Sequence, residues 1–141
     1  MSTATKDRIE TLEEFYAYVQ ANGKLRTVGH AQRWTTATLL TMGTNLGKAS
    51  KSALGNALPE ELKAELIRFM GIAAIFRNTN LDSREFCNRV ARRSRGTSDA
   101  DFAKYPVQAV FGAIKRLVNS DVADTVKDDL SPELANMWEK A

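Results

Sequence analysis

Arginine is concentrated in one stretch of this sequence, and that stretch is the strongest candidate for a binding function. Six arginines and two carboxylates lie between residues 77 and 95, so the segment carries a net charge of +4. At about 100° per residue, a helix here places its arginines on the side opposite Phe86 and Val90. The candidate binding face consists of Arg84, Arg89, Arg92, Arg93 and Arg95.

Three interpretations of this basic face remain open. Guanidinium groups can neutralise the phosphates of a nucleic acid, with an affinity that falls steeply as salt is added. They can equally meet the carboxylates of an acidic protein partner, or remain solvated and paired with acids of a neighbouring helix. Aromatic residues are not interleaved with the arginines, which disfavours stacking on single-stranded bases. A solvated or salt-bridged face is the simplest of the three.

The residues that build metal and nucleophilic sites are scarce. The chain has one histidine, His30, and one cysteine, Cys87, so it lacks the three or four Cys or His ligands of a usual zinc site. We expect Cys87 to be a small core residue and His30 a solvated residue at a helix start. Trp34 and Trp138 are expected in the core. The sequence therefore predicts no catalytic residue, no metal and no cofactor.

Composition is that of a globular protein, with 43% hydrophobic residues and a formal net charge of +3. The longest apolar run has about eight residues, well below the ~20 that span a bilayer, so no membrane partner is expected. No apolar segment typical of a secretory signal precedes Glu10. A single cysteine is compatible with a reducing compartment, which predicts a cytoplasmic location.

Capping residues and apolar periodicity predict helices throughout the chain. A capping box at Thr11 and Glu14 starts the first helix, and a second box at Asp82 and Glu85 starts the arginine-rich helix. Gly47 is expected to end one long helix. The predicted segments are 11–23, 30–46, 50–58, 59–77, 82–95, 98–118, 119–130 and 131–138. The helix over 59–77 is apolar along most of its later length and is expected to be the central buried element. Asp128 and Asp129, near a helix C-terminus, have no explanation in the sequence.

The two halves of the chain follow one pattern. Glu14, Phe15 and Val19 align with Glu85, Phe86 and Val90 at an offset of 71. At an offset of 72, apolar residues meet apolar residues at eight further positions. The first partners are Ala37, Leu39, Met42, Leu46, Leu54, Leu58, Leu62 and Leu66, and the second are Ala109, Phe111, Ile114, Val118, Val126, Leu130, Leu134 and Trp138.

An internal repeat of this size predicts an all-α fold of two tandem repeats, each with about four helices. A unit of about 70 residues is marginal alone, so the two should pack into one pseudo-twofold bundle. The expected divisions are a flexible N-terminal tail over 1–10, a first repeat over 11–77 and a second repeat over 78–141.

The order Glu-Phe-x-x-x-Val, long helix, short polar helix and Leu58-Pro59-Glu60-Glu61-Leu62 resembles the uncharacterised bacterial family DUF2267. Its members are tandem helical repeats ending in Leu-Pro-x-x-Leu turns. The resemblance extends from Thr11 to Trp138, and the second copy departs from it at Leu130-Ser131-Pro132. It implies a helical bundle in a bacterial cytoplasm. The family has no established activity, so no functional residue is carried over.

By exclusion, the sequence favours a non-enzymatic helical module that binds another protein, which includes a second copy of itself. The alternatives are a nucleic-acid-binding protein that uses the arginine face, and a small-ligand binder with a pocket between the repeats.

Overall fold

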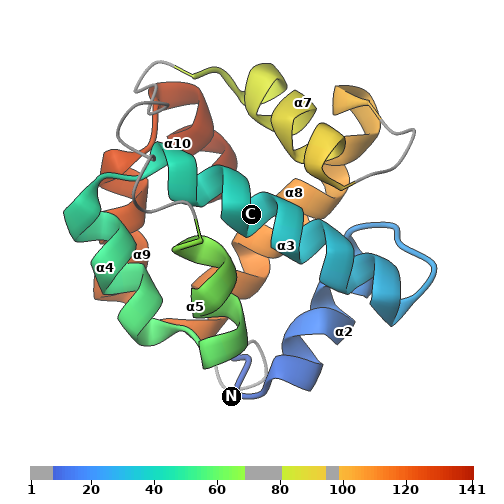
Figure 1. Ribbon diagram of the computed structural model, residues 1–141, viewed down its shortest axis with the longest axis horizontal. Helices are drawn as coiled ribbons and strands as arrows, with labels where there is room; N and C mark the ends of the chain where they lie inside the picture. The colour runs from blue at the N-terminus through green and yellow to red at the C-terminus, as the bar shows by residue number, and fades with distance from the viewer. Residues whose placement is uncertain (1–7, 69–80, 95–98) are drawn as a thin grey trace.

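A computed structural model of the chain describes residues 8–68, 81–94 and 99–141 (Figure 1). Within these ranges the structure is all-helical, with eight helices and no strand. The helices are α2 (Leu12–Asn22), α3 (Val28–Asn45), α4 (Lys48–Ala57), α5 (Glu60–Leu66), α7 (Ser83–Arg93), α8 (Ala100–Leu117), α9 (Ser120–Asp129) and α10 (Pro132–Lys140). None of the described helices is long and apolar enough to cross a membrane.

Side-chain caps fix most helix starts where the sequence predicted them. Thr11 Oγ1 accepts the Glu14 backbone N–H at 3.1 Å, and Glu14 Oε1 accepts the Thr11 N–H at 3.0 Å, so the first capping box is confirmed. Asp82 caps α7 by accepting the Glu85 N–H at 2.7 Å, but the Glu85 carboxylate accepts from Arg89 and Arg92, so only half of the second predicted capping box forms. α3 begins at Val28, two residues earlier than predicted, because the Thr27 hydroxyl is its N-cap.

The predicted role of Gly47 is wrong. Gly47 begins a helix and does not end one: it is the N-cap of α4 with φ −70°, while Leu46 closes α3. A glycine has no capping side chain, and Asp129 of α9 supplies one by accepting the Gly47 N–H. This contact explains an acidic residue at the end of α9, because its carboxylate lies at the positive N-terminus of α4.

The predicted helix over 59–77 does not run as one element. α5 ends at Leu66, and Ile67 and Arg68 form a turn; residues 69–80, and with them the boundary between the predicted repeats, lie outside the described residues. Among the described helices α3 and α8 are the most buried, and twelve of the 18 residues of α3 are buried.

α3 is central although four of its buried residues are threonines, at positions 35, 38, 41 and 44. Thr38 Oγ1 donates to the Trp34 carbonyl and Thr41 Oγ1 to the Ala37 carbonyl, each at 2.8 Å. A hydroxyl that bonds to the preceding turn can be buried without an unsatisfied donor, which accounts for Thr38 and Thr41. The Thr35 hydroxyl is also buried, and it has no hydrogen-bond partner among the described residues.

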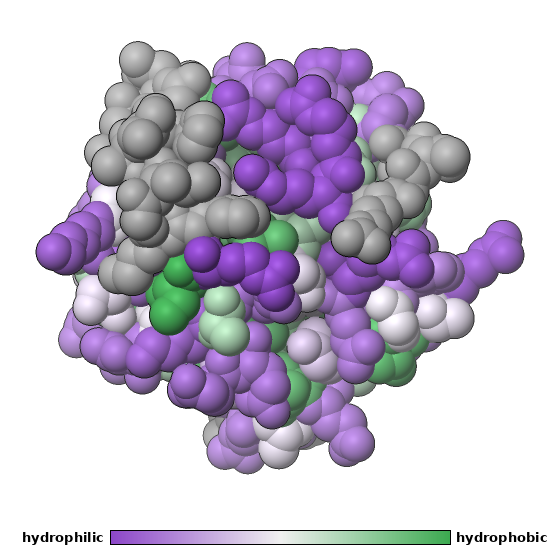
Figure 2. Space-filling model, in the orientation of Figure 1, coloured by the Kyte–Doolittle hydropathy of each residue, from purple (hydrophilic) through white to green (hydrophobic). Residues whose placement is uncertain are grey.

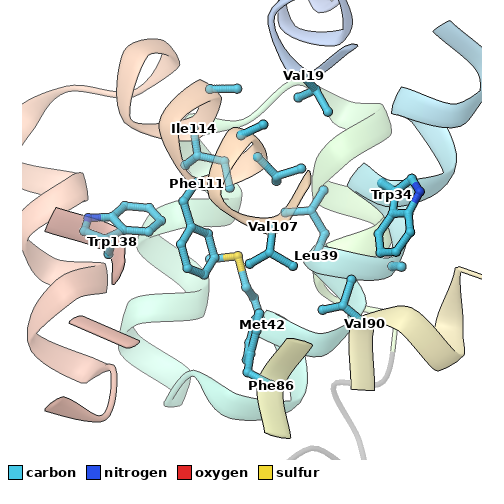
Figure 3. Close-up of a cluster of buried hydrophobic side chains, with 14 of the residues drawn as sticks. Val19, Trp34, Leu39, Met42, Phe86, Val90, Val107, Phe111, Ile114 and Trp138 are labelled. Atoms are coloured by element: carbon cyan, nitrogen blue, oxygen red, sulfur yellow. The ribbon is translucent and has the colours of Figure 1, made fainter. Parts of the chain in front are cut away.

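The hydrophobic core lies where α2, α3, α7 and α8 meet (Figure 3). α2 and α7 each pack on both α3 and α8, while α4 lies against α9 at the side (Figure 1). The Phe111 ring centroid is 5.7 Å from that of Phe86 and 5.2 Å from that of Trp138. Trp34 and Trp138 are both buried, as predicted.

The start of the chain is partly fixed by α8. The Ile9 backbone N–H donates to the Arg116 carbonyl at 3.0 Å, and the Ile9 side chain is buried. Arg8 Nη1 donates to the Val118 carbonyl at 3.0 Å, at the C-terminus of α8. Residues 8–10 of the predicted tail are therefore attached to the bundle, and residues 1–7 lie outside the described ranges.

Gly43 allows α5 to approach α3. A Cβ atom on Gly43 would lie 2.1 Å from the Leu66 carbonyl oxygen, a backbone atom that cannot move aside alone. Gly43→Ala is expected to lower the free energy of unfolding by about 1–3 kcal/mol, because the two helices must separate. Urea denaturation measures the change. Gly29→Ala on the same helix is the control, since its Cβ would meet only the Thr27 hydroxyl at 3.6 Å. Equal midpoints for the two variants would contradict the close approach.

Candidate functional site

The arginine-rich helix α7 is held by its apolar side. Phe86 and Val90 are fully buried, and α7 packs on both α3 and α8. This orientation is the one predicted from the sequence, and it turns Arg89, Arg92 and Arg93 away from the core. In Figure 2, strongly hydrophilic atoms gather where Figure 1 places α7.

Two of these arginines share one carboxylate. Arg89 Nε and Arg92 Nη2 each donate to Glu85 Oε2 at 3.2 Å, from one and two turns along the same helix. The Arg92 side chain is 69% exposed and that of Arg89 is 30% exposed. Exposed ion pairs of this kind contribute little stability, so they leave the guanidinium groups available to a ligand.

Arg93 bridges α7 and α3. Its Nη1 donates to Thr41 Oγ1 at 2.9 Å, and the Thr41 hydroxyl is held by its own bond to the Ala37 carbonyl. No carboxylate in the described part of the chain forms an ion pair with Arg93. Burial lowers the pKa of Arg93, and the positive charges of Arg89 and Arg92 lower it further. Despite this lowered pKa, the Arg93 guanidinium stays protonated at neutral pH. Arg93 therefore carries a half-buried positive charge that no described carboxylate neutralises.

Two concave regions adjoin Arg93. The first, of about 360 Å³, is bordered by Thr44 with Arg89, Arg92 and Arg93. The second, of about 440 Å³, follows α3 from Gly29 to Leu40 and is bordered by Arg33, Arg68 and Arg93. We define the arginine cluster as Arg33, Arg68, Arg89, Arg92 and Arg93. Its described carboxylates are Glu85 and Glu65, the latter 3.0 Å from Arg68, so positive charge is in excess.

The arginines of the predicted binding face do not all lie together in the structure. Arg89, Arg92 and Arg93 lie together, whereas Arg84 forms an ion pair with Asp101 of α8 at 3.0 Å and borders a different pocket. Arg95 lies outside the described residues. Sequence reasoning missed Arg33 and Arg68, which belong to other elements and come near α7 only through tertiary packing. No local signal in the sequence distinguished them from ordinary surface arginines.

The remaining candidate residues are placed as follows. Cys87 is 2% exposed and packs within the core, as predicted. His30 lies in the first turn of α3, half-buried, and its backbone N–H is used by the Thr27 cap.

A comparison with known protein families identifies the family of this chain. Residues 12–137 match the family described as an uncharacterized conserved protein, DUF2267. The chain belongs to the DUF2267 family. No curated protein matches the chain. Membership confirms the resemblance seen in the sequence, and since this DUF2267 family is uncharacterised, the site must be interpreted from its own geometry.

An inorganic anion is expected to stabilise this DUF2267 protein by binding the arginine cluster. At a pyrophosphate concentration ten times Kd, linkage gives about 1.4 kcal/mol of added stability, measured as a rise in Tm. Arg92→Gln should reduce this rise. Arg84→Gln should keep it, since both side chains are 69% exposed but only Arg92 belongs to the cluster. An equal rise in the two variants would show that the anion binds elsewhere.

The thiol of this DUF2267 protein is expected to react slowly. Burial raises the pKa of Cys87 from its ordinary 9.0 to about 11, and the nearby Lys104 ammonium opposes this only in part. At pH 8 the reactive thiolate is therefore about a hundredfold scarcer than in the unfolded chain. Alkylation by iodoacetamide, followed by mass spectrometry, should accelerate with pH until about pH 11. A native rate at pH 8 equal to that in urea would contradict the burial.

Proposed function

We propose that this protein is a non-enzymatic interaction module that binds an acidic segment of a partner protein through the arginine cluster. The observation that carries the proposal is Arg93, held by Thr41 between two concave regions with excess positive charge. A carboxylate in either region would neutralise charges that repel one another. The site is therefore complementary to acidic side chains.

Guanidinium groups suit this role because their donors form paired hydrogen bonds with a carboxylate. Arg93 is already ordered by its bond to Thr41, so less side-chain entropy is lost when a ligand binds. The exposed Arg92 is suited to early contact and to steering an acidic partner.

A nucleic acid is the competing ligand. No aromatic side chain is among the described residues that border either concave region, so no stacking surface for bases is provided there. The guanidinium groups come from α3, from the turn after α5 and from α7, and they border two separate concave regions. These features favour the protein partner.

We also propose that the fold is an internal repeat about a pseudo-twofold axis. α2 and α7 have 11 residues each, α3 and α8 have 18, and α4 and α9 have 10. Gly43 faces the Leu66 carbonyl, and at an offset of 72 Lys115 donates to the Trp138 carbonyl at 2.8 Å. Both features support equivalent helix pairs in the two halves. We further propose a cytoplasmic location, since a single cysteine needs no oxidising compartment. A bacterial source is what the resemblance to DUF2267 implies.

Affinity capture from native lysate of the source cells tests the proposed function, with and without nuclease. The wild-type protein should retain a partner that survives nuclease and is released as salt is raised. Arg92→Glu should weaken capture about tenfold or more, because it places a repelling charge at the site. Arg84→Glu changes charge by the same amount at an equally exposed position of the same helix, and should retain the partner.

The outcomes separate the alternatives. Recovery that vanishes with nuclease would replace the protein partner with a nucleic acid. Retention by Arg92→Glu equal to that by Arg84→Glu would exclude the arginine cluster as the binding site. Capture of the chain's own second copy, with an acidic surface at the contact, would identify self-association as the interaction.

A further inference from the structure

A second pocket, separate from the arginine cluster, lies within the C-terminal half of the chain. It has a volume of about 530 Å³ and is bordered by α7, α8 and α10. Pockets that hold small molecules have volumes of about 300–1,000 Å³, so a compact ligand would fit. The sequence suggested a pocket between the repeats, whereas this one is formed by helices of the second half alone.

The carboxylates in its wall already have partners. Asp101 Oδ1 accepts from Arg84 Nη1 at 3.0 Å. Glu133 Oε1 accepts from the Ser83 backbone N–H at 3.0 Å and from the Ser83 hydroxyl at 2.9 Å. Both acids are thus satisfied within the wall.

Two ammonium groups border the pocket and, unlike the carboxylates, have no ion-pair partner among the described residues. Lys104 and Lys140 form no ion pair with any described carboxylate. The Lys104 ammonium lies 5.1 Å from the centroid of the Tyr105 ring, a contact that leaves its hydrogen-bond donors unused. Gln108 and Asn136 also border the pocket and provide amide groups. The available chemistry is therefore cationic, with amides that can orient a polar ligand.

Part of the pocket lining is apolar. Ala100 and Cys87 are 4% and 2% exposed, and Met137 is half-buried beside them. The Cys87 thiol is protonated at neutral pH and behaves there as a small neutral group. An anionic ligand with a short apolar body would match both parts of this lining.

The first half of the chain has a larger side chain at the position that matches Cys87. At the offset of 71, Tyr16 corresponds to Cys87. Burial raises the pKa of Tyr16, and the negative charges of Glu61 and Glu65 raise it further, which places the Tyr16 ring beside α5. The first half thus has a large, partly buried aromatic side chain at the position where the second half has only a thiol. This comparison uses the proposed repeat, but the pocket and its lining do not depend on it.

We propose that the pocket between α7, α8 and α10 binds a small organic carboxylate. Lys104 and Lys140 hold its anionic group, and its apolar body lies against Cys87 and Met137. The ligand class follows from unpaired cations together with a partly apolar lining, and it differs from the acidic protein segment assigned to the arginine cluster.

Titration with benzoate, followed by backbone amide NMR shifts, tests this assignment. Saturable shifts are expected for amides along the pocket in α7, α8 and α10. Benzamide has the same ring without the charge, so it should bind at least tenfold more weakly. Lys104→Gln, at an exposed position, should weaken benzoate binding several-fold and leave the fold unchanged.

Cys87→Tyr tests the role of the open space. It introduces the side chain that the first half carries at the matching position, and it should abolish benzoate binding. If this variant does not fold, Lys104→Gln with the benzoate and benzamide comparison still decides the assignment. Equal binding of benzoate and benzamide, or shifts confined to the arginine cluster, would overturn it.

Arg92→Glu distinguishes the two proposals. Benzoate shifts at the pocket should be unchanged in this variant, while capture of the acidic partner should fall. Loss of both in Arg92→Glu would show that benzoate binds at the arginine cluster and that the pocket is not a site. Loss of partner capture alone would leave each site with its own ligand.

Discussion

The packing of α2 and α7 onto both long helices is the constraint on which the rest of the structure depends. Each short helix buries two apolar residues, Phe15 and Val19 in α2 and Phe86 and Val90 in α7, all fully buried. Both pairs are covered by helices from the two halves of the chain, since α2 and α7 each pack on α3 and on α8. The core is therefore shared, and helices from both halves are needed to close it.

This shared core determines where charge can lie. Because Phe86 and Val90 must face inward, the arginines of α7 lie at the seam with α3, where Thr41 receives Arg93. Burial disfavours the charged form of Arg93, and the positive charges of Arg89 and Arg92 repel it. This arrangement lowers the stability of the folded protein, and a bound anion would offset that loss. Local destabilisation of this kind is common where a protein binds a ligand of opposite charge.

Differences between the two halves matter as much as their likeness. At Gly43 the Leu66 carbonyl lies directly against α3, because glycine has no side chain. On α8 the Lys115 ammonium donates a hydrogen bond to the Trp138 carbonyl. Tyr16 occupies space beside α5, whereas Cys87 leaves a pocket beside α10. The two halves offer different surfaces: arginines gather between α3 and α7, and a pocket with a mixed polar and apolar lining lies between α7, α8 and α10.

The sequence by itself determined where most helices begin and which face of each is apolar, because caps and periodicity are local. Thr11, Asp82, Asp99, Asn119 and Ser131 all act as N-caps. Family membership followed from the same local pattern. Tertiary structure decided the rest. Tertiary packing explains why α5 ends at Leu66 and why the threonine-rich α3 is central. It also places the Asp129 carboxylate at the start of α4, and Arg33 and Arg68 beside the same concave region as Arg93. Each of these depends on groups far apart in the chain, and their distances are set by how helices pack, which no local pattern encodes.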